Sequence, residues 1–319
     1  MRTPKEWIYD CGIIPVVVLS KVEDASPTAE ALLKGGVDVM EITLRTSAGP
    51  DSIREVSKNC PEMLVGAGTV LNINDCEACV EAGAKFIVSP GFDKELVNFC
   101  LEHDILVIPG CVTPTEIMQS LNLGLDLIKF FPANIYGGLA ALKALSGPFP
   151  NVKFIPTGGI DQFNLKEYLD LPNVYAVGGS WICNKTDIRN HEFNKIMQLA
   201  SQSRSTLLGF ELAHVGINCS NEEEALKSAR KLNEIFGMQV EDGNSSCYAG
   251  KGIEFIKSKF LGAHGHLAVR TNDIVRAIVY LKSRGYLMDE NNIKTQQGKI
   301  IAAYLQEQVS GFAIHLQQK

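Results

Sequence analysis

Short apolar segments that suit β-strands recur through the first half of the chain, and segments with helical patterning separate them. This alternation constrains the fold more than any other feature, because strands joined by helices form a parallel sheet. Eight parallel strands are the number that closes a β/α barrel. The eight strand segments are 13–19, 39–43, 64–69, 86–90, 106–110, 127–131, 154–158 and 174–178.

The alternative for such a pattern is an open, doubly wound sheet. No G-x-G-x-x-G follows the first strand segment, which argues against a dinucleotide-binding version of that fold. Helix signals lie between the strands: Thr113, Pro114 and Glu116 form a capping-box pattern, and 26–36 begins with Ser-Pro and ends on glycine. We therefore favour the (β/α)8 barrel, of the TIM type, over residues 1–206.

The pattern changes after a helix-like stretch at 187–205. From about residue 210 a strand, a long helix and three strands follow one another, and the same order then repeats to the end of the chain. This tandem βαβββ duplication predicts a separate α+β domain over residues 207–319. A chain of 319 residues comfortably accommodates two domains.

Composition and charge exclude several classes of function. Hydrophobic residues make up 45% of the chain and charged residues 21%, which predicts a packed globular protein. The formal net charge is -6 and no block of Lys and Arg stands out, so we expect neither nucleic acid nor a membrane as partner. No apolar segment has the length of a membrane helix and the first residues lack a signal-peptide pattern, so we expect a cytoplasmic protein.

The nine cysteines are scattered through apolar segments. Cys76 and Cys79 form a C-x-x-C inside an amphipathic helical pattern at 72–84, whereas redox motifs of this kind lie where a strand meets a helix. Buried, reduced cysteines are therefore favoured over a redox pair.

Side-chain alternation along the strands selects the residues with chemistry. Glu41 and Arg45 share one face of their segment, and Lys129 shares a face with Phe131 in "LIKFF". In a barrel these faces point to the interior or its C-terminal mouth, where barrel enzymes place their active sites. A lysine among apolar side chains loses hydration, which favours the neutral amine that attacks a ketone to form a Schiff base. The simpler alternative is a Lys129–Glu41 ion pair that only stabilises the barrel.

Two glycine pairs indicate a phosphate site. "PTGGI" at 156–160 and "VGGSW" at 177–181 follow the last two strand segments, where barrel enzymes commonly bind phosphate. Paired glycines let backbone N–H groups approach an anion, and Thr157 and Ser180 add hydroxyl donors.

Seven ordered motifs then resemble one family. "EITLRT", "GAGTV", "SPGF", "IPG", "IKFFPA", "GPFPNVKFIPTGGI" and "VGGSW" are similar to those of the 2-keto-3-deoxy-6-phosphogluconate (KDPG) aldolases, whose relatives also cleave 4-hydroxy-2-oxoglutarate (KHG). The resemblance covers roughly residues 5 to 200. It implies a class I aldolase that cleaves KDPG to pyruvate and glyceraldehyde 3-phosphate, without a cofactor, as a homotrimer acting on a small 2-keto acid phosphate.

The resemblance also implies a role for each matching residue. Lys129 would form the Schiff base, and Glu41 would act as general acid and base. Arg45 and Thr69 would hold the pyruvate carboxylate. The remaining matched residues are Thr157, Gly158, Gly159, Gly179 and Ser180, which would cradle the phosphate, and Pro90 and Phe131, which would line the pocket. Asn134 departs from the family pattern, in which many members carry glutamate, and this leaves the detail of its loop open.

The second domain resembles the glyoxalase/vicinal-oxygen-chelate superfamily over about residues 210 to 319. In metal-binding members four strand positions hold a divalent ion, and they align here with His214, Glu254, His266 and His315, the last replacing the more usual glutamate. Imidazole and carboxylate ligands suit zinc, iron, nickel or manganese. A metal site and a ligand-binding or assembly module that has kept old ligand positions both remain open.

Two other functions compete with an aldolase. One is a metal-dependent lyase or dioxygenase centred on the second domain, with the barrel as a degenerate scaffold; the intact Lys129, Glu41 and Arg45 set argues against it. The other is a regulatory phosphate-binding module, which leaves the buried amine without a role.

Overall fold

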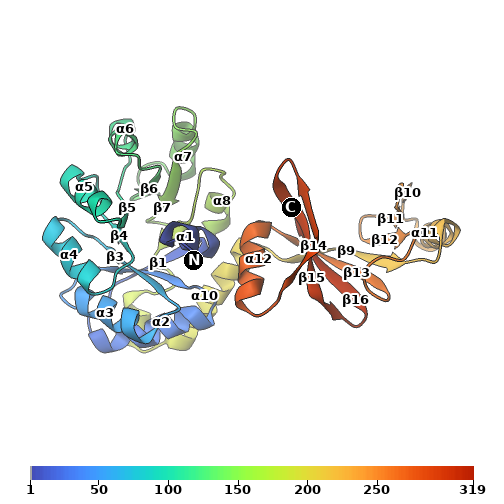
Figure 1. Cartoon of the computed structure of the whole chain (residues 1–319), viewed down its shortest axis with the longest axis horizontal. Helices are drawn as coiled ribbons and strands as arrows, with labels where there is room; N and C mark the ends of the chain where they lie inside the picture. The colour runs from blue at the N-terminus through green and yellow to red at the C-terminus, as the bar shows by residue number, and fades with distance from the viewer. Residues whose placement is uncertain (1) are drawn as a thin grey trace. The chain divides into compact units, whose positions relative to one another are not determined.

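The computed structural model describes residues 2–319. The chain divides into two units, of which the first ends at Leu207 and the second spans Leu208–Lys319. In the first unit helices alternate with strands around a parallel sheet, and Figure 1 shows the helices on its outer side. The strands are β1 (Ile13–Val17), β2 (Val39–Thr43), β3 (Leu64–Gly68), β4 (Phe86–Val88), β5 (Leu106–Ile108), β6 (Leu127–Phe130), β7 (Lys153–Pro156) and β8 (Val177–Gly179).

The sheet closes into a barrel. Six strands are bonded in the order β5-β4-β3-β2-β1-β8, and β6 pairs with β7. Two isolated parallel bridges join these sheets, Gly110 with Lys129 between β5 and β6, and Thr157 with Gly178 between β7 and β8. The predicted β/α barrel is therefore confirmed, and the carboxyl ends of its strands share one face.

The helices of this unit begin and end at recognisable signals. Thr113 caps α6, where its hydroxyl and the Glu116 carboxylate form the predicted capping box. The helices are α1 (Pro4–Cys11), η1 (Val22–Asp24), α2 (Ala25–Lys34), α3 (Gly49–Asn59), α4 (Ile73–Glu81), α5 (Lys94–Glu102), α6 (Pro114–Asn122), α7 (Gly138–Ser146), α8 (Leu165–Leu169), α9 (Lys185–Arg189) and α10 (Phe193–Leu208).

Most predicted strand segments extend one or two residues beyond the observed strands, and three other boundaries differ for reasons that the structure shows. The helix expected from Ser26 begins at Ala25, because the short helix η1 leads directly into it. The helix-like stretch 187–205 is two helices, and His191 between them has a positive φ of 55°, which ends α9. The eighth strand is Val177–Gly179, because Val174 makes only an isolated bridge to Phe154.

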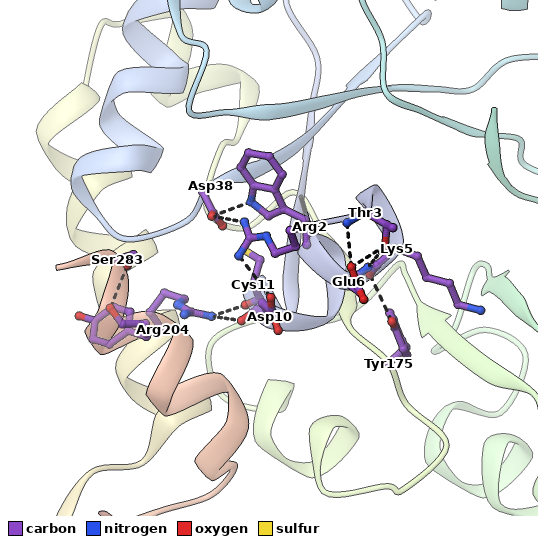
Figure 2. Close-up of polar contacts among 12 residues, drawn as sticks. Arg2, Thr3, Lys5, Glu6, Asp10, Cys11, Asp38, Tyr175, Arg204 and Ser283 are labelled. Atoms are coloured by element: carbon purple, nitrogen blue, oxygen red, sulfur yellow. Dashed lines mark hydrogen bonds and ion pairs between the residues drawn. The ribbon is translucent and has the colours of Figure 1, made fainter. Parts of the chain in front are cut away.

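Helix α1 lies across the amino-terminal ends of the strands. Arg2 donates to Asp10 within the segment and to Asp38, which immediately precedes β2 (Figure 2). The indole N–H of Trp7 also donates to Asp38, at 2.6 Å. Lys5 pairs with Asp126 just before β6, at 2.6 Å. The opposite, carboxyl-terminal face is thus the one that stays accessible to a ligand.

The second unit is built from two βαβββ halves. The first consists of β9 (Glu211–Asn218), α11 (Glu222–Phe236), β10 (Val240–Asp242), β11 (Ser246–Ala249) and β12 (Ile253–Ile256). The second consists of β13 (Gly265–Thr271), α12 (Ile274–Ser283), β14 (Met288–Gln296), β15 (Lys299–Val309) and β16 (Phe312–Gln318). All eight strands form one sheet, in the order β10-β11-β12-β9-β13-β16-β15-β14, and the predicted duplication is confirmed (Figure 1).

The two halves meet where β9 and β13 pair antiparallel. Each of these strands also pairs in parallel with the last strand of its own half, β9 with β12 and β13 with β16. Four adjacent strands therefore bring residues from both halves together at the middle of the sheet.

Candidate functional site

Lys129 and Glu41 meet inside the barrel. Lys129 lies on β6 and Glu41 on β2, and Nζ lies 3.1 Å from Oε1 and 3.4 Å from Oε2 of the carboxylate. Both residues are buried, with 5% and 3% of their surface exposed. Strands four positions apart in an eight-stranded barrel lie opposite each other, so this contact places both side chains in the interior, as strand alternation predicts.

The Lys129 amine lies next to a carboxylate as well as to apolar groups. Its Nζ lies 5.3 Å from the ring centroid of Phe131. The apolar run in the sequence therefore describes only part of its environment. Because Glu41 is within hydrogen-bonding distance, the carboxylate can take a proton from the ammonium and leave a neutral amine without solvent.

Gly68 provides the space that Glu41 occupies. A Cβ at this position would overlap Oε1, Cγ and Cδ of the Glu41 side chain. The next residue, Thr69, has a positive φ of 59°, an uncommon conformation for a residue with a branched side chain. The "GAGTV" motif thus shapes the backbone beside the carboxylate.

The loops after β7 and β8 line a cavity of about 290 Å³. Arg45, which follows β2, lies at the same cavity, and so does Phe131. Among the residues predicted to cradle phosphate, all five line it: Thr157, Gly158, Gly159, Gly179 and Ser180.

The glycine loop after β7 presents backbone donors. Gly158 and Gly159 have positive φ angles of 95° and 76°, which a residue with a Cβ adopts only with strain. Their carbonyls accept hydrogen bonds from Asn134, but no hydrogen bond found within residues 2–319 uses their N–H groups. Two adjacent free N–H groups form the kind of cradle that binds an anion.

Asn134 joins the loops after β6 and β7. Its Nδ2 donates to the carbonyl of Gly159 at 2.7 Å, and its Oδ1 accepts from the hydroxyl of Tyr168 at 2.7 Å. Asn164 also donates to the Gly159 carbonyl, at 2.9 Å. The residue that departs from the family pattern therefore positions the glycine loop after β7.

Four of the predicted site residues do not line this cavity. Lys129, Glu41, Thr69 and Pro90 are not among the residues that line the 290 Å³ cavity, and Pro90 is exposed in the loop after β4. Arg45 lies two residues beyond Thr43, where β2 ends, so strand alternation does not apply to it, although it lies at the mouth of the barrel as expected. The guanidinium lies on a loop at the mouth of the barrel.

The sequence reasoning missed six residues that line this cavity. Ile160 ends the "PTGGI" motif and Lys185 follows the "VGGSW" loop, and the other four carry no chemical signature in the sequence. These residues are Val16, Val18, Ile160, Cys183, Asn184 and Lys185.

All nine cysteines are buried and free. Cys76 faces Cys100 of α5 with 3.7 Å between the sulfurs, whereas Cys79 of the C-x-x-C is not its partner. Burial raises the pKa of Cys79 to about 12. These are the properties of packed thiols.

The second unit contains a histidine cluster. Ligand atoms of His214, His266 and His315 lie within 4.8 Å of one another. The Nε2 atoms of His214 and His266 are 2.9 Å apart, and they lie 3.1 and 3.2 Å from Oε2 of Glu254. All four residues line a cavity of about 680 Å³.

The arrangement fits a divalent metal. If both Nε2 atoms donate to Oε2 of Glu254, their two protons lie close together across the 2.9 Å gap, whereas a cation among the three atoms accepts a lone pair from each. Burial, together with the charge of His266, lowers the pKa of His315 to about 4, so its imidazole is neutral, as a ligand must be. The donor set of nitrogen and oxygen suits zinc, iron, nickel or manganese.

The surrounding residues hold this cluster in place. Oε1 of Glu254 accepts hydrogen bonds from Ser246 at 2.5 Å and from Tyr248 at 3.1 Å. Burial raises the pKa of Glu254, but the hydrogen bonds from His214, His266 and Ser246 outweigh it and keep this carboxyl ionised. Gly216 pairs with His266 across the sheet, and a Cβ there would overlap the imidazole ring.

No helix within residues 2–319 combines the length and apolar character needed to cross a membrane.

Comparisons with known proteins concern the first unit. The family model "KDPG and KHG aldolase" matches residues 5–199. The 2-dehydro-3-deoxy-phosphogluconate aldolase of Treponema pallidum is 44% identical over 203 residues, which are 64% of this chain and 97% of that protein. The KHG/KDPG aldolase of Escherichia coli K12 is 43% identical over 203 residues, which are 63% of this chain and 95% of that protein.

A solved structure agrees with these matches. KDPG aldolase from Legionella pneumophila, with pyruvate captured at low pH as a covalent carbinolamine intermediate, superposes with a TM-score of 0.61 at 44% identity. The match covers 62% of this chain and 97% of that one. With the barrel, the buried lysine–glutamate pair and the glycine loops, these similarities show that the chain belongs to the KDPG and KHG aldolase family.

Proposed function

We propose that the first unit is a class I aldolase that cleaves KDPG to pyruvate and glyceraldehyde 3-phosphate, and KHG to pyruvate and glyoxylate. The observation that carries this proposal is the buried Lys129–Glu41 pair, with Nζ 3.1 Å from Oε1. An amine nucleophile beside an acid/base group is the minimal apparatus for Schiff-base chemistry. The aldolase needs no metal or organic cofactor.

The reaction begins at Lys129. Glu41 takes the ammonium proton, and the neutral Nζ attacks the C2 ketone of the substrate. Loss of water from the resulting carbinolamine gives a protonated imine, which withdraws electrons from C3. The Lys129–Glu41 pair thus activates both reacting groups. The amine is activated by deprotonation, and the ketone is activated by conversion to a protonated imine.

Bond cleavage follows from this electron sink. A base removes the proton of the C4 hydroxyl, the C3–C4 bond breaks, and its electron pair moves into an enamine while the aldehyde leaves. Glu41 returns a proton to C3, working partly through water. Hydrolysis of the imine then releases pyruvate and restores Lys129.

The two ends of the substrate bind to different groups. Arg45 offers a planar pair of donors for the pyruvate carboxylate, with Thr69 beside it. The phosphate is held by the N–H groups and hydroxyls of the two glycine loops, Thr157, Gly158, Gly159, Gly179 and Ser180. Pro90 and Phe131 line the pocket.

The proposed function also suggests how the protein assembles and where it acts. We infer a homotrimer that acts in the cytoplasm, where nine buried, free cysteines stay reduced. Light scattering of the purified protein tests the trimer.

The decisive test is chemical trapping. Incubation with pyruvate and borohydride, followed by peptide mass spectrometry, is expected to place a stable adduct on Lys129. The Lys129→Ala variant is expected to form none and to cleave no substrate. An adduct on another lysine, or an unmodified wild-type protein, would falsify the Schiff-base assignment.

The histidine cluster favours a second function for residues 208–319. We propose that His214, Glu254, His266 and His315 bind a divalent transition metal in a glyoxalase-like domain. A bound ion supplies a Lewis acid, and Ser246 and Tyr248 keep the Glu254 carboxylate oriented toward it. The aldolase reaction takes place independently of this site.

Elemental analysis of the purified chain tests the metal site. We expect close to one equivalent of a divalent transition metal in the wild type, and loss of that metal in His214→Ala together with His266→Ala. Aldolase activity is expected to survive chelation. Isothermal titration without tight binding of zinc, nickel, iron or manganese would eliminate the site.

A further inference from the structure

The phosphate cavity contains a cationic residue that the glycine loops do not account for. Lys185 lines the 290 Å³ cavity together with Gly158, Gly159 and Ser180. Its side chain is exposed, and no ion pair or hydrogen bond to it is found within residues 2–319. It is thus available to a ligand.

The backbone of Lys185 has a defined position. Asn184 caps α9, with its Oδ1 accepting from the N–H of Asp187 at 2.9 Å. The Asp187 carboxylate is buried and already occupied, because Oδ1 accepts from Lys195 at 2.8 Å and the other oxygen accepts from Asn184. The nearby acid therefore stabilises the loop and leaves Lys185 without a counter-ion.

The charges that line the cavity are of one sign. Arg45 and Lys185 are its two charged residues, and no Asp or Glu lines it. The strands that precede them, β2 and β8, both neighbour β1. The substrate has a carboxylate at one end and a phosphate at the other, and Arg45 is assigned to the carboxylate, which leaves Lys185 as the cation for the phosphate.

We propose that Lys185 pairs with the phosphate dianion and sets the preference for phosphorylated over non-phosphorylated 2-keto acids. This inference rests on the proposed aldolase function. Backbone N–H groups bind an anion through partial charges, whereas an ammonium contributes a full charge. Lys185 therefore adds most binding energy for the phosphate dianion, and less for KHG, which is shorter and ends in a carboxylate with a single charge. Its removal weakens ground-state and transition-state binding alike, which raises KM and leaves kcat little changed.

The test compares Lys185→Ala and Lys185→Arg with wild type on KDPG and on KHG. A charge-assisted bond predicts a drop of about 10-fold in kcat/KM for KDPG in Lys185→Ala, with KHG unchanged and the arginine variant close to wild type. Lys166→Ala, which removes an exposed lysine paired with Asp170 away from the cavity, is the matched control.

Inorganic phosphate provides an independent measurement. With KHG as the reporter substrate, inhibition by phosphate is expected to require about 10-fold more phosphate in Lys185→Ala than in wild type. Equal inhibition in both proteins, or an equal loss of activity on both substrates, would overturn the assignment. If the aldolase function holds, pyruvate and borohydride still label Lys129 in Lys185→Ala. This labelling distinguishes a failure of the Lys185 assignment from a failure of the aldolase function.

Discussion

Nζ of Lys129 and Oε1 of Glu41 lie 3.1 Å apart, although the two residues are 88 positions apart in the sequence. Removing one partner of such a buried pair leaves the other unpaired. The contact therefore links the chemistry of the site to the packing of the barrel, and the first two predictions concern it.

Glu41→Gln keeps the size of the side chain and removes its proton-transfer capacity. We expect kcat to fall by about 10²- to 10⁴-fold. Exchange of the pyruvate methyl protons with D2O, followed by NMR, reports the enamine step directly and is expected to slow by a similar factor. Glu62→Gln changes an exposed carboxylate and serves as the control. Unaltered exchange in Glu41→Gln would rule out Glu41 as the acid/base group.

Gly68→Ala is expected to displace the Glu41 carboxylate, because the new Cβ overlaps Oε1. We expect kcat to fall at least about 100-fold, the contribution of a positioned acid/base. Thermal unfolding is expected to show a loss of about 1–3 kcal/mol from overpacking. Gly91→Ala introduces the same methyl group into open space in the same unit and is expected to keep wild-type activity. Full activity in Gly68→Ala would mean that Glu41 works from another position.

Asn134→Ala is expected to loosen the phosphate loop, because it removes the bonds to Gly159 and Tyr168. We expect KM for KDPG to rise by about 2- to 10-fold, with KM for KHG little changed. Tyr168→Phe removes one of these bonds and keeps the other, so its effect is expected to be smaller. Initial-rate kinetics on both substrates check the prediction, and equal effects of the two variants would contradict it.

Alkaline pH is expected to destabilise the first unit through its buried thiols. Burial raises the pKa of Cys11, Cys79 and Cys111 to about 12, from 9.0. A folded-state pKa above the unfolded value means that the stabilisation is complete below pH 9 and is lost as the pH rises from 9 toward 12. Urea unfolding of the whole chain at pH 8, 9 and 10 measures this loss.

The control for this prediction is Cys11→Ala, which is expected to reduce the pH dependence. A thiol reagent at pH 8 is expected to modify the nine cysteines only after unfolding. Rapid labelling of the native protein would show that the thiols are not packed as the structure describes.

The sequence predicted the barrel because each strand is a short apolar run and each helix carries an amphipathic pattern. Periodicity also identified Lys129 and Glu41 as interior residues, since both lie within regular strands. Arg45 lies at the mouth of the barrel as expected, but it lies beyond the end of β2, where side-chain alternation no longer applies.

Which residues act together in each site depends on tertiary contacts, which the sequence pattern does not show. The bonds of Asn134 to Gly159 and Tyr168 join three separate loops, and no local pattern marks such partners. Lys185 is a single exposed lysine, and its significance comes from the acid-free cavity around it. The resemblance to the glyoxalase superfamily named His214, His266 and His315 as one set, and the pairing of β13 with β9 and β16 is what places them on adjacent strands.

Both backbone groups of Lys129, the N–H and the carbonyl, form hydrogen bonds with the segment that follows β5. Its N–H donates to the carbonyl of Pro109, and its carbonyl accepts from the N–H of Cys111, while its other edge faces Ile155 of β7. A substrate bonded to Nζ, as we propose, would therefore be attached to a nearly immobile Cα through four methylene groups. Its search for a reactive orientation would be confined to rotations of one side chain. Turnover needs no rearrangement of the strand that carries the intermediate.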